Sequence, residues 1–384
     1  MTNDELLSKT ISYLRFPLII GVVFIHFNLA KNGFMMQIEN GFDYPDWFYY
    51  IIFFFSDVLP RIGVPLFFFF SGFLFFYRKD FNNKVYKQKL HTRAATLLLP
   101  YFLWNTIAIL IKVFRKLPFL SSVFPNAYKT EILLSPERLI KTFFANLDNE
   151  GIFITSIVDN AMTVVNKTPF PINVPLWYVR DLIIMVILSP ILFGLIKKGG
   201  VWFIAVLGVI WYIIKPLFLQ EGGYPVLFFT AAFFFSFGAY FSIKKVNFID
   251  YMRKAQFFPY LYFVFVIADT LTKKYDYNIY IHEAGILIGV VSAIIITSVL
   301  LEKRKVTVNM TLSNCSFFVF ALHTLIMSDV ATALLTIFHF SGNTYSMLLL
   351  YFMVPTITIL ICILAFIFLK RYIPKVCNIL TGGR

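Results

Sequence analysis

Two ionisable residues interrupt the first long apolar stretch of the chain, and their spacing suits chemistry inside a membrane. Residues 11–30, ISYLRFPLIIGVVFIHFNLA, contain Arg15 and His26. Eleven residues at about 100° each make roughly three helical turns, so both side chains share a face, ~16 Å apart along the axis. A guanidinium suits an anionic phosphate-bearing group, and a histidine accepts a proton near neutral pH. The pair predicts a path on which a long anionic reactant binds near Arg15 and reacts near His26.

The composition identifies the elements that must position this pair. Of the 384 residues, 59% are hydrophobic and 14% are charged, whereas soluble domains are about 25% charged. Ten segments are apolar enough to cross a bilayer: 11–30, 48–76, 94–114, 174–196, 201–219, 224–243, 256–272, 283–301, 312–336 and 345–369. We therefore expect an all-α, polytopic transmembrane helix bundle of about ten spans, with residues 1–384 forming a single integral membrane domain.

Basic residues alternate between the connections, which predicts the topology. Connection 77–93 holds six Lys and Arg against one acid, whereas 31–47 holds one Lys against three acids. Connection 273–282, with two Lys, departs from the alternation. The positive-inside rule places both termini in the cytoplasm, as an even number of spans requires. The placement of the basic residues in alternate connections explains the net charge of +14. We therefore expect contact with lipids of the cytoplasmic (inner) membrane and not with nucleic acid.

The second apolar segment carries an expected distortion and an expected ion pair. Pro60, Gly63 and Pro65 predict a kink or local break near 60–65. Asp57 and Arg61 are spaced i, i+4, so they can pair on one helix face and support the distorted region. The long connection 115–173 contains a short amphipathic segment, 135–147, that predicts a helix on the membrane surface or over a cavity.

Several motifs, taken in order, resemble the acyltransferase family 3 membrane proteins. Arg15 and His26, with ten residues between them, resemble the family's R-x10-H motif in the first helix. Four later stretches are also similar to its signatures: VPLFFFFSGFLF (64–75), Arg93 followed by LLLPYFLW (97–104), PLWYVRDL (175–182) and FALHTLI (320–326). The chain departs from the family at Ala95 and Thr96, where further arginines are common.

The resemblance implies a reaction and roles for three residues. Members move an acyl group, commonly acetyl, from cytoplasmic acyl-CoA to a hydroxyl of a surface glycan or of its lipid-linked precursor. Carried onto this chain, His26 would be the general base for the acceptor hydroxyl, and Arg15 and Arg93 would hold the CoA side. Acetyl-CoA, or another acyl-CoA, would be a co-substrate, with no bound cofactor and no metal.

The resemblance also implies roles for four further residues, each of which has an alternative structural interpretation. Ser71 and Gly72 would contact the thioester or allow close helix approach. Arg180 would bind the acceptor or anchor its helix at the interface; its neighbour Asp181 should point elsewhere on the helix, so we expect no simple pair. His323 would support the site or form an interhelical hydrogen bond.

Other polar residues flank the apolar segments near the expected outer side. His282 and His339 lie at segment edges, where we expect them to be solvated. Asp269 and Asp329 are candidate partners of a histidine or of the acceptor. The three cysteines have no metal-ligand spacing.

Two other classes of protein share these general features. Secondary transporters and exporters of lipid-linked sugars also combine many spans with intramembrane charges, but they favour inverted repeats and matched broken helices. Only one break is evident in the sequence. A non-catalytic scaffold for glycan assembly is a third possibility, which the Arg15–His26 stripe disfavours. The oligomeric state is left open.

Overall fold

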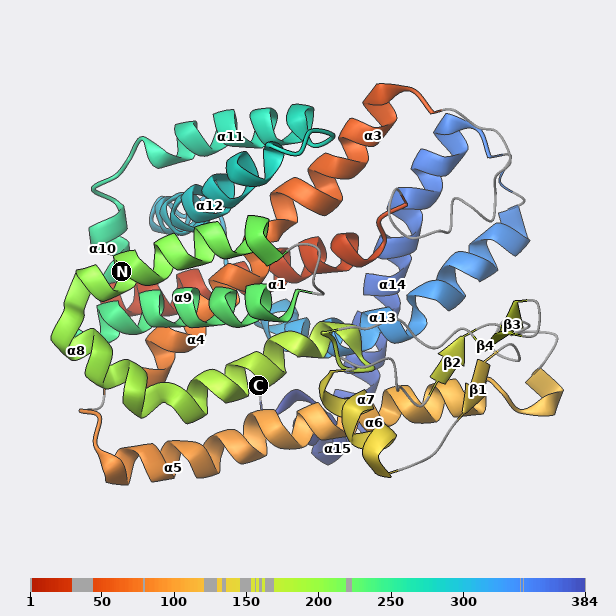
Figure 1. Ribbon diagram of the computed structural model, residues 1–384, viewed down its shortest axis with the longest axis horizontal. Helices are drawn as coiled ribbons and strands as arrows, with labels where there is room; N and C mark the ends of the chain where they lie inside the picture. The colour runs from red at the N-terminus through yellow and green to blue at the C-terminus, as the bar shows by residue number, and fades with distance from the viewer. Residues whose placement is uncertain are drawn as a thin grey trace.

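The computed structural model describes residues 2–29, 44–78, 80–120, 130–132, 136–145, 153–155, 157–158, 161–162, 169–218, 223–338, 340 and 342–383. These residues form a helical bundle (Figure 1), which confirms the all-α prediction. The α-helices are α1 (Asn3–His26), α3 (Asp46–Ile52), α4 (Gly63–Phe76), α5 (Asn83–Arg93), α6 (Leu99–Phe114), α7 (Pro136–Phe144), α8 (Trp177–Phe218), α9 (Tyr224–Ile243), α10 (Phe248–Met252), α11 (Phe258–Thr272), α12 (Asn278–Glu302), α13 (Met310–Phe338), α14 (Thr344–Tyr372) and α15 (Pro374–Thr381).

Short irregular elements complete the described part. Two antiparallel strand pairs join β1 (Thr130–Ile132) to β2 (Phe153–Thr155), and β3 (Ile157–Val158) to β4 (Ala161–Met162). The π-helical turns are η1 (Phe53–Val58) and η3 (Ala94–Leu98), and the 3-10 turns are η2 (Leu59–Ile62), η4 (Pro118–Leu120) and η6 (Val174–Leu176).

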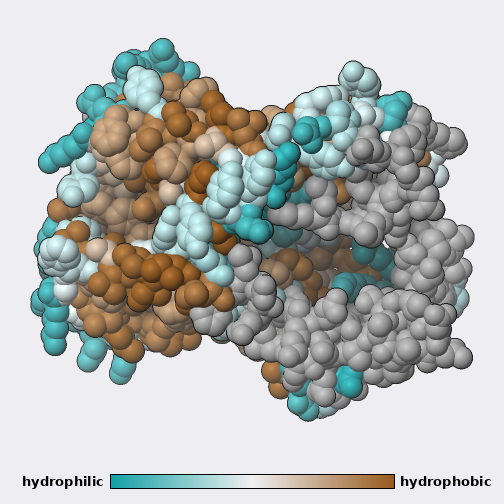
Figure 2. All heavy atoms as spheres, turned by 45° about the horizontal axis from the view of Figure 1, so that its top comes forward, coloured by the Kyte–Doolittle hydropathy of each residue, from teal (hydrophilic) through white to brown (hydrophobic). Residues whose placement is uncertain are grey.

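The helices agree with a multi-pass membrane protein. Within the described residues, eight helical segments are long and apolar enough to cross a bilayer, and α11 is a shorter apolar helix. One of the eight, Val174–Leu217, turns at Gly200, whose φ is 54°, so α8 has two arms that match predicted segments 174–196 and 201–219. Figure 2 shows apolar side chains over a broad area of the described surface, as lipid contact requires.

Two predicted boundaries were wrong for a local reason. Helix α5 begins at Asn83, so most of the expected basic connection 77–93 is helical. The Asn82 side chain accepts a hydrogen bond from the Val85 backbone N–H and caps α5. Similarly, α1 spans Asn3–His26 and not 11–30, because the Thr2 hydroxyl caps it by accepting from the Glu5 N–H. Polar capping residues therefore start both helices earlier than the apolar pattern indicates.

The predicted distortion of the second segment is present, but it begins earlier than expected. The irregular turns η1 and η2 cover 53–62, and α4 is regular from Gly63 onward. Pro60 has no N–H to bond the carbonyl of Ser56, one turn before it, and the widened π turn accommodates this loss. The π turn η3 precedes Pro100 in the same way. Pro65 lies in the first turn of α4, where a missing N–H costs little.

Helix α1 lies at the centre of the bundle. It packs against α4, α12, α13 and α14, and it runs through the middle of the view in Figure 1. Val22 and Val23 on α1 are almost fully buried. The helix that carries Arg15 and His26 is therefore surrounded by protein.

The N-terminus and two of the basic segments share one end of the bundle. Arg78 forms an ion pair with Asp4 at 2.5 Å, and Lys245 pairs with Asp80 at 3.3 Å. Asn3 also donates to Asp250 at 3.3 Å. This clustering agrees with the predicted alternation of charge, while the cytoplasmic placement of both termini stays a prediction.

Helices α4 and α9 approach each other closely because glycines lie at their crossing. A methyl group on Gly72 would lie 1.9 Å from the Phe235 carbonyl oxygen, and one on Gly238 would lie 1.8 Å from that of Phe69. Both contacts are with backbone, so only a shift of a whole helix would relieve them. Gly72 thus serves the close helix approach that the sequence suggested as one of its roles.

We expect Gly72→Ala to lower the free energy of unfolding by roughly 1–3 kcal/mol or more, as overpacking of a core does. Thermal unfolding in detergent measures this effect. The matched control is Gly194→Ala on α8, where an added methyl group meets no atom within 4 Å. Equal unfolding temperatures for the two variants would contradict the packing role.

Candidate active site

A cavity at the α1–α4–α13 junction brings together the residues predicted to bind the donor. Arg15, Ser71, Arg93, Tyr178 and Phe320 all line it. They come from α1, α4, the end of α5, α8 and α13 respectively. Gly72 is not among the lining residues, because it faces α9. Arg15, Ser71 and Arg93, which are far apart in sequence but were predicted to act together, therefore share one cavity.

The cavity is positively charged. Arg15 and Arg93 are both half-buried, and in the described part of the chain neither guanidinium has a hydrogen bond or a carboxylate partner. In the same cavity, the Tyr178 hydroxyl lies 3.0 Å from the Ser71 hydroxyl. Two guanidinium groups without a neutralising carboxylate favour binding of an anion such as a phosphate.

A pair of histidines lies farther along the same two helices. His26 is the last residue of α1, and its ring centroid is 5.2 Å from that of His323 on α13. His323 is fully buried, and its Nδ1 lies 3.0 Å from the Val319 carbonyl oxygen. Because a carbonyl only accepts, Nδ1 carries the proton and Nε2 keeps its lone pair. That Nε2 has no hydrogen-bond partner among the described residues, so it is free to accept a proton or a hydrogen bond.

The cavity and the histidine pair are neighbours. Phe320 lines the cavity, and its ring centroid lies 6.5 Å from that of His323, one turn away on α13. Tyr178 packs edge-on against Phe320 at 5.9 Å. On α1, Arg15 lines the cavity and His26 belongs to the histidine pair. On α13, Phe320 lines the same cavity and His323 belongs to the same pair. The stripe predicted on α1 therefore has a counterpart on α13.

Buried hydrogen bonds fix the end of α1 at His26. Asp57 pairs with Arg61 at 2.7 Å, as predicted, and it also accepts a 2.5 Å hydrogen bond from Asn28. The Ser56 hydroxyl donates to the Phe24 carbonyl at 2.7 Å and lies 2.7 Å from the Tyr351 hydroxyl. Sequence reasoning missed Asn28 and Ser56, although Asn28 was visible as a polar residue in the first apolar stretch.

Arg180 ties several segments together, and one prediction about it was wrong. It is buried, and it bonds its neighbour Asp181 at 2.7 Å, since its long side chain folds back beside the start of α8. The same guanidinium donates to the carbonyls of Phe144 and Pro169, both at 2.6 Å. Arg180 therefore ties α7, the predicted amphipathic helix, to the segment that enters α8.

Asn173 holds the turn of α13 that carries His323. Its side-chain amide donates to the Ala321 carbonyl at 2.9 Å, and its side-chain oxygen accepts from Thr324 at 3.2 Å. Its backbone N–H donates to Asn105 at 3.2 Å. The contacts with Ala321 and Thr324 lie on either side of His323 along α13, and the contact with Asn105 links Asn173 to α6. No local pattern in the sequence indicates this role, because the partners of Asn173 lie on separate helices.

We expect Asn173→Ala to destabilise the protein by roughly 1–3 kcal/mol, the cost of leaving buried polar groups unpaired. We also expect a fall in activity, because His323 loses its support. Thermal unfolding and acyl transfer measured on the same preparation test this. An unchanged unfolding temperature together with an unchanged rate of acyl transfer would contradict the supporting role of Asn173.

The remaining predicted polar residues have distinct outcomes. His282 is buried and its Nδ1 lies 2.7 Å from Asp269, so the expectation of a solvated histidine was wrong; α12 begins at Asn278 and packs against α11. This contact does confirm Asp269 as the partner of a histidine. Asp329 instead pairs with Arg115. His339 lies outside the described residues.

Comparisons with known proteins agree with this geometry. The sequence matches the acyltransferase domain of the acyltransferase 3 family over residues 9–368. It is 26% identical, over 99% of this chain and 94% of the relative, to the succinoglycan biosynthesis protein ExoH of Rhizobium meliloti (strain 1021). No solved structure matches the chain.

Proposed function

The chain belongs to the acyltransferase 3 family of membrane proteins, and we propose that it transfers an acyl group from acyl-CoA to a hydroxyl of a cell-surface polysaccharide or of its lipid-linked precursor. The observation that carries this proposal is the arrangement along α1. At one end, a cavity is lined by two guanidinium groups that have no carboxylate partner among the described residues, and at the other end two histidine rings meet.

The cavity is suited to the donor. Acyl-CoA is long and anionic, and Arg15 and Arg93 offer several N–H donors to its phosphates. The Ser71 and Tyr178 hydroxyls, 3.0 Å apart, supply neutral hydrogen bonds in the same cavity. In this arrangement the thioester arm extends past Phe320 toward the histidines. Acetyl-CoA is the donor to test first, because acetyl is common in the family.

The histidines are suited to activate the acceptor. His26 accepts the proton of the acceptor hydroxyl as its oxygen attacks the thioester carbonyl, and the new C–O bond replaces the C–S bond. The departing thiolate then takes the proton from His26, which gives free CoA thiol and returns His26 to its neutral form. His323 lies beside His26 and presents its unprotonated Nε2 to stabilise the protonated partner.

The nature of the acceptor rests on the comparison with a relative. The name of the ExoH protein refers to biosynthesis of succinoglycan, so we propose a polysaccharide acceptor here too. The predicted topology, with both termini in the cytoplasm, would place Arg15 toward cytoplasmic acyl-CoA and His26 toward the outer side of the cytoplasmic membrane.

The test is transfer of a labelled acyl group. Membranes that contain the protein are incubated with acetyl-CoA labelled in the acetyl group and with extracted cell-surface polysaccharide. We expect alkali-labile label in the polysaccharide, as an ester requires. Transport of unmodified lipid-linked saccharide without any labelling would contradict the proposal and favour an exporter.

A further inference from the structure

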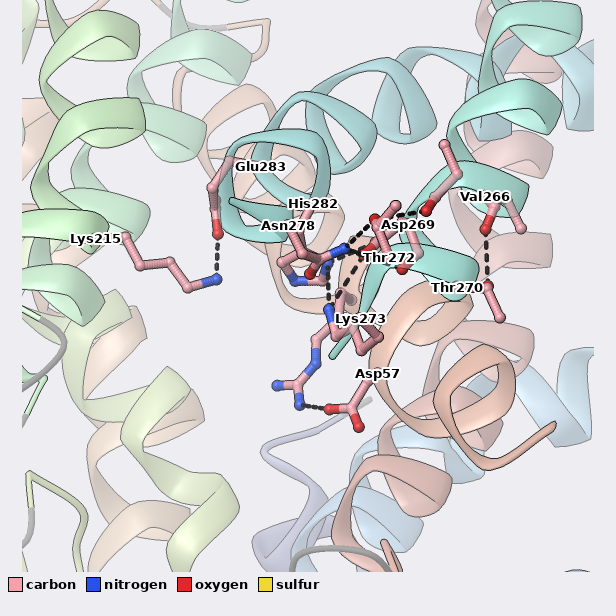
Figure 3. Close-up of polar contacts among 12 residues, drawn as sticks. Asp57, Lys215, Val266, Asp269, Thr270, Thr272, Lys273, Asn278, His282 and Glu283 are labelled. Atoms are coloured by element: carbon pink, nitrogen blue, oxygen red, sulfur yellow. Dashed lines mark hydrogen bonds and ion pairs between the residues drawn. The ribbon is translucent and has the colours of Figure 1, made fainter. Parts of the chain in front are cut away.

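A second polar site lies beyond the histidine pair, and the proposed reaction does not yet use it. Three cationic side chains line a cleft between the second span, the second arm of α8 and the α11–α12 connection: Arg61, Lys215 and Lys273. We call it the cationic cleft. Figure 3 shows Lys215 reaching toward Glu283 on α12, while Lys273 and His282 converge on Asp269. None of these residues lines the cavity that contains Arg15.

Each cation of the cleft is paired with a carboxylate that lies deeper in the protein. Asp57, Glu283 and Asp269 have side-chain exposures of 1%, 2% and 4%. Their partners Arg61, Lys215 and Lys273 have exposures of 34%, 26% and 14%. The carboxylates thus hold the cations from behind, and the cations form the accessible wall. Two acids also line the cleft: Asp57, whose carboxylate is buried against Arg61, and the exposed Asp276. Among the described lining residues, the accessible side chains are therefore three cations and one acid.

The cations keep hydrogen-bond donors for a ligand. In the described part of the chain, Arg61 uses one of its terminal nitrogens for Asp57, and Lys215 bonds only Glu283. A guanidinium has five N–H donors and an ammonium has three. Lys273 bonds Asp269 at 3.2 Å and lies 3.1 Å from His282 Nδ1. Donors oriented by buried carboxylates suit a group with several anionic oxygens.

The cationic cleft is connected to the histidine pair. Asp57 bonds both Arg61 and Asn28, which lies two residues after His26. A ligand anchored by Arg61 is therefore near the group that we assign as the base.

We propose that the cationic cleft binds an anionic group of the acceptor saccharide, a carboxylate of a sugar or a phosphate of a lipid-linked precursor. The proposal rests on the proposed acyl transfer and names the class of acceptor. An anion held by Arg61, Lys215 and Lys273 positions a neighbouring hydroxyl at His26. The cleft and the donor cavity share no lining residue. The cleft therefore sets the affinity for the acceptor and does not change the affinity for acyl-CoA.

The first test uses the unmodified protein. Acceptor-dependent release of CoA thiol is measured with extracted polysaccharide and with the same polysaccharide after its carboxyl groups are reduced to alcohols. Loss of charge-assisted hydrogen bonds should raise the apparent KM for the acceptor about tenfold or more. A rise in this KM after carboxyl reduction identifies the anionic group of the acceptor as a carboxylate. If KM is unchanged but inorganic pyrophosphate competes with the acceptor, the anionic group is a phosphate.

The second test uses a double variant that avoids a buried unpaired carboxylate. Lys215→Met with Glu283→Leu replaces one ion pair by apolar side chains of similar size. We expect its apparent KM for the native polysaccharide to rise about tenfold, while the KM for acyl-CoA stays at the wild-type value. Lys198→Met, an exposed lysine of α8 outside the cleft, is the control and should match the wild type.

The outcomes separate this proposal from the proposed function. If carboxyl reduction, pyrophosphate and the double variant all leave the acceptor KM unchanged while polysaccharide still stimulates thiol release, the cationic cleft proposal is overturned and acyl transfer stands. If polysaccharide never stimulates thiol release in the wild type, the proposed function itself fails.

Discussion

Replacing His26 by alanine is expected to lower the rate of acyl transfer by about 10²–10⁴-fold, the usual contribution of a general base. The ring is the only imidazole on α1, and it lies 5.2 Å from His323 at the end of the stripe that starts at Arg15. Binding of acyl-CoA should persist, because the donor cavity does not include His26. Labelled acetyl transfer and equilibrium binding of acetyl-CoA measure the two effects.

The partner histidine provides the matched control for this result. We expect His323→Asn to lower the rate less than His26→Ala, since His323 acts through its neighbour and its Nδ1 is occupied by the Val319 carbonyl. Thermal unfolding of both variants checks that each is folded. A larger loss at His323 than at His26, with equal stability, would reverse the roles of the two residues.

Neutralising the two arginines of the cavity should weaken donor binding. Hydrogen bonds to charged groups contribute about 1.5–3 kcal/mol each, so Arg15→Met and Arg93→Met should each raise the apparent KM for acyl-CoA about 10–100-fold. Neither guanidinium has a carboxylate partner among the described residues, so neither change leaves a buried carboxylate unpaired. Initial rates at varied acyl-CoA concentration give the values.

Two further variants sharpen this prediction. Arg15→Lys keeps the charge but loses the fork of donors, so its KM should lie between those of the wild type and Arg15→Met. If both arginines hold one anionic group, the effects in the double variant should be less than additive, because the residues share a partner. Unchanged KM values with a lower rate would instead assign the arginines to the chemical step.

The candidate site was predictable from sequence where it depends on one helix. The eleven-residue spacing of Arg15 and His26 fixes their common face, because helical periodicity is a local property. The i, i+4 spacing of Asp57 and Arg61 predicted their ion pair for the same reason. The shared cavity of Arg15, Ser71 and Arg93 followed from the family resemblance and not from their spacing.

The remaining features depend on which helices become neighbours. Asn173 supports α13, and His282 is buried against Asp269, through contacts between separate helices that no local pattern encodes. The prolines predicted a distorted second span, but the position of the π turn depends on the carbonyl that each proline leaves unbonded. Capping by Thr2 and Asn82 likewise extended helices beyond their apolar cores.

The central claim is that Arg15 and His26 mark the donor end and the chemical end of one path. Release of CoA thiol from acetyl-CoA, measured with purified protein in lipid vesicles and extracted polysaccharide, tests it most directly. The account predicts release by the wild type, loss in His26→Ala with donor binding kept, and a raised KM for acetyl-CoA in Arg15→Met. If the wild type neither binds nor consumes any acyl-CoA under these conditions, or if both variants match it, the claim is contradicted.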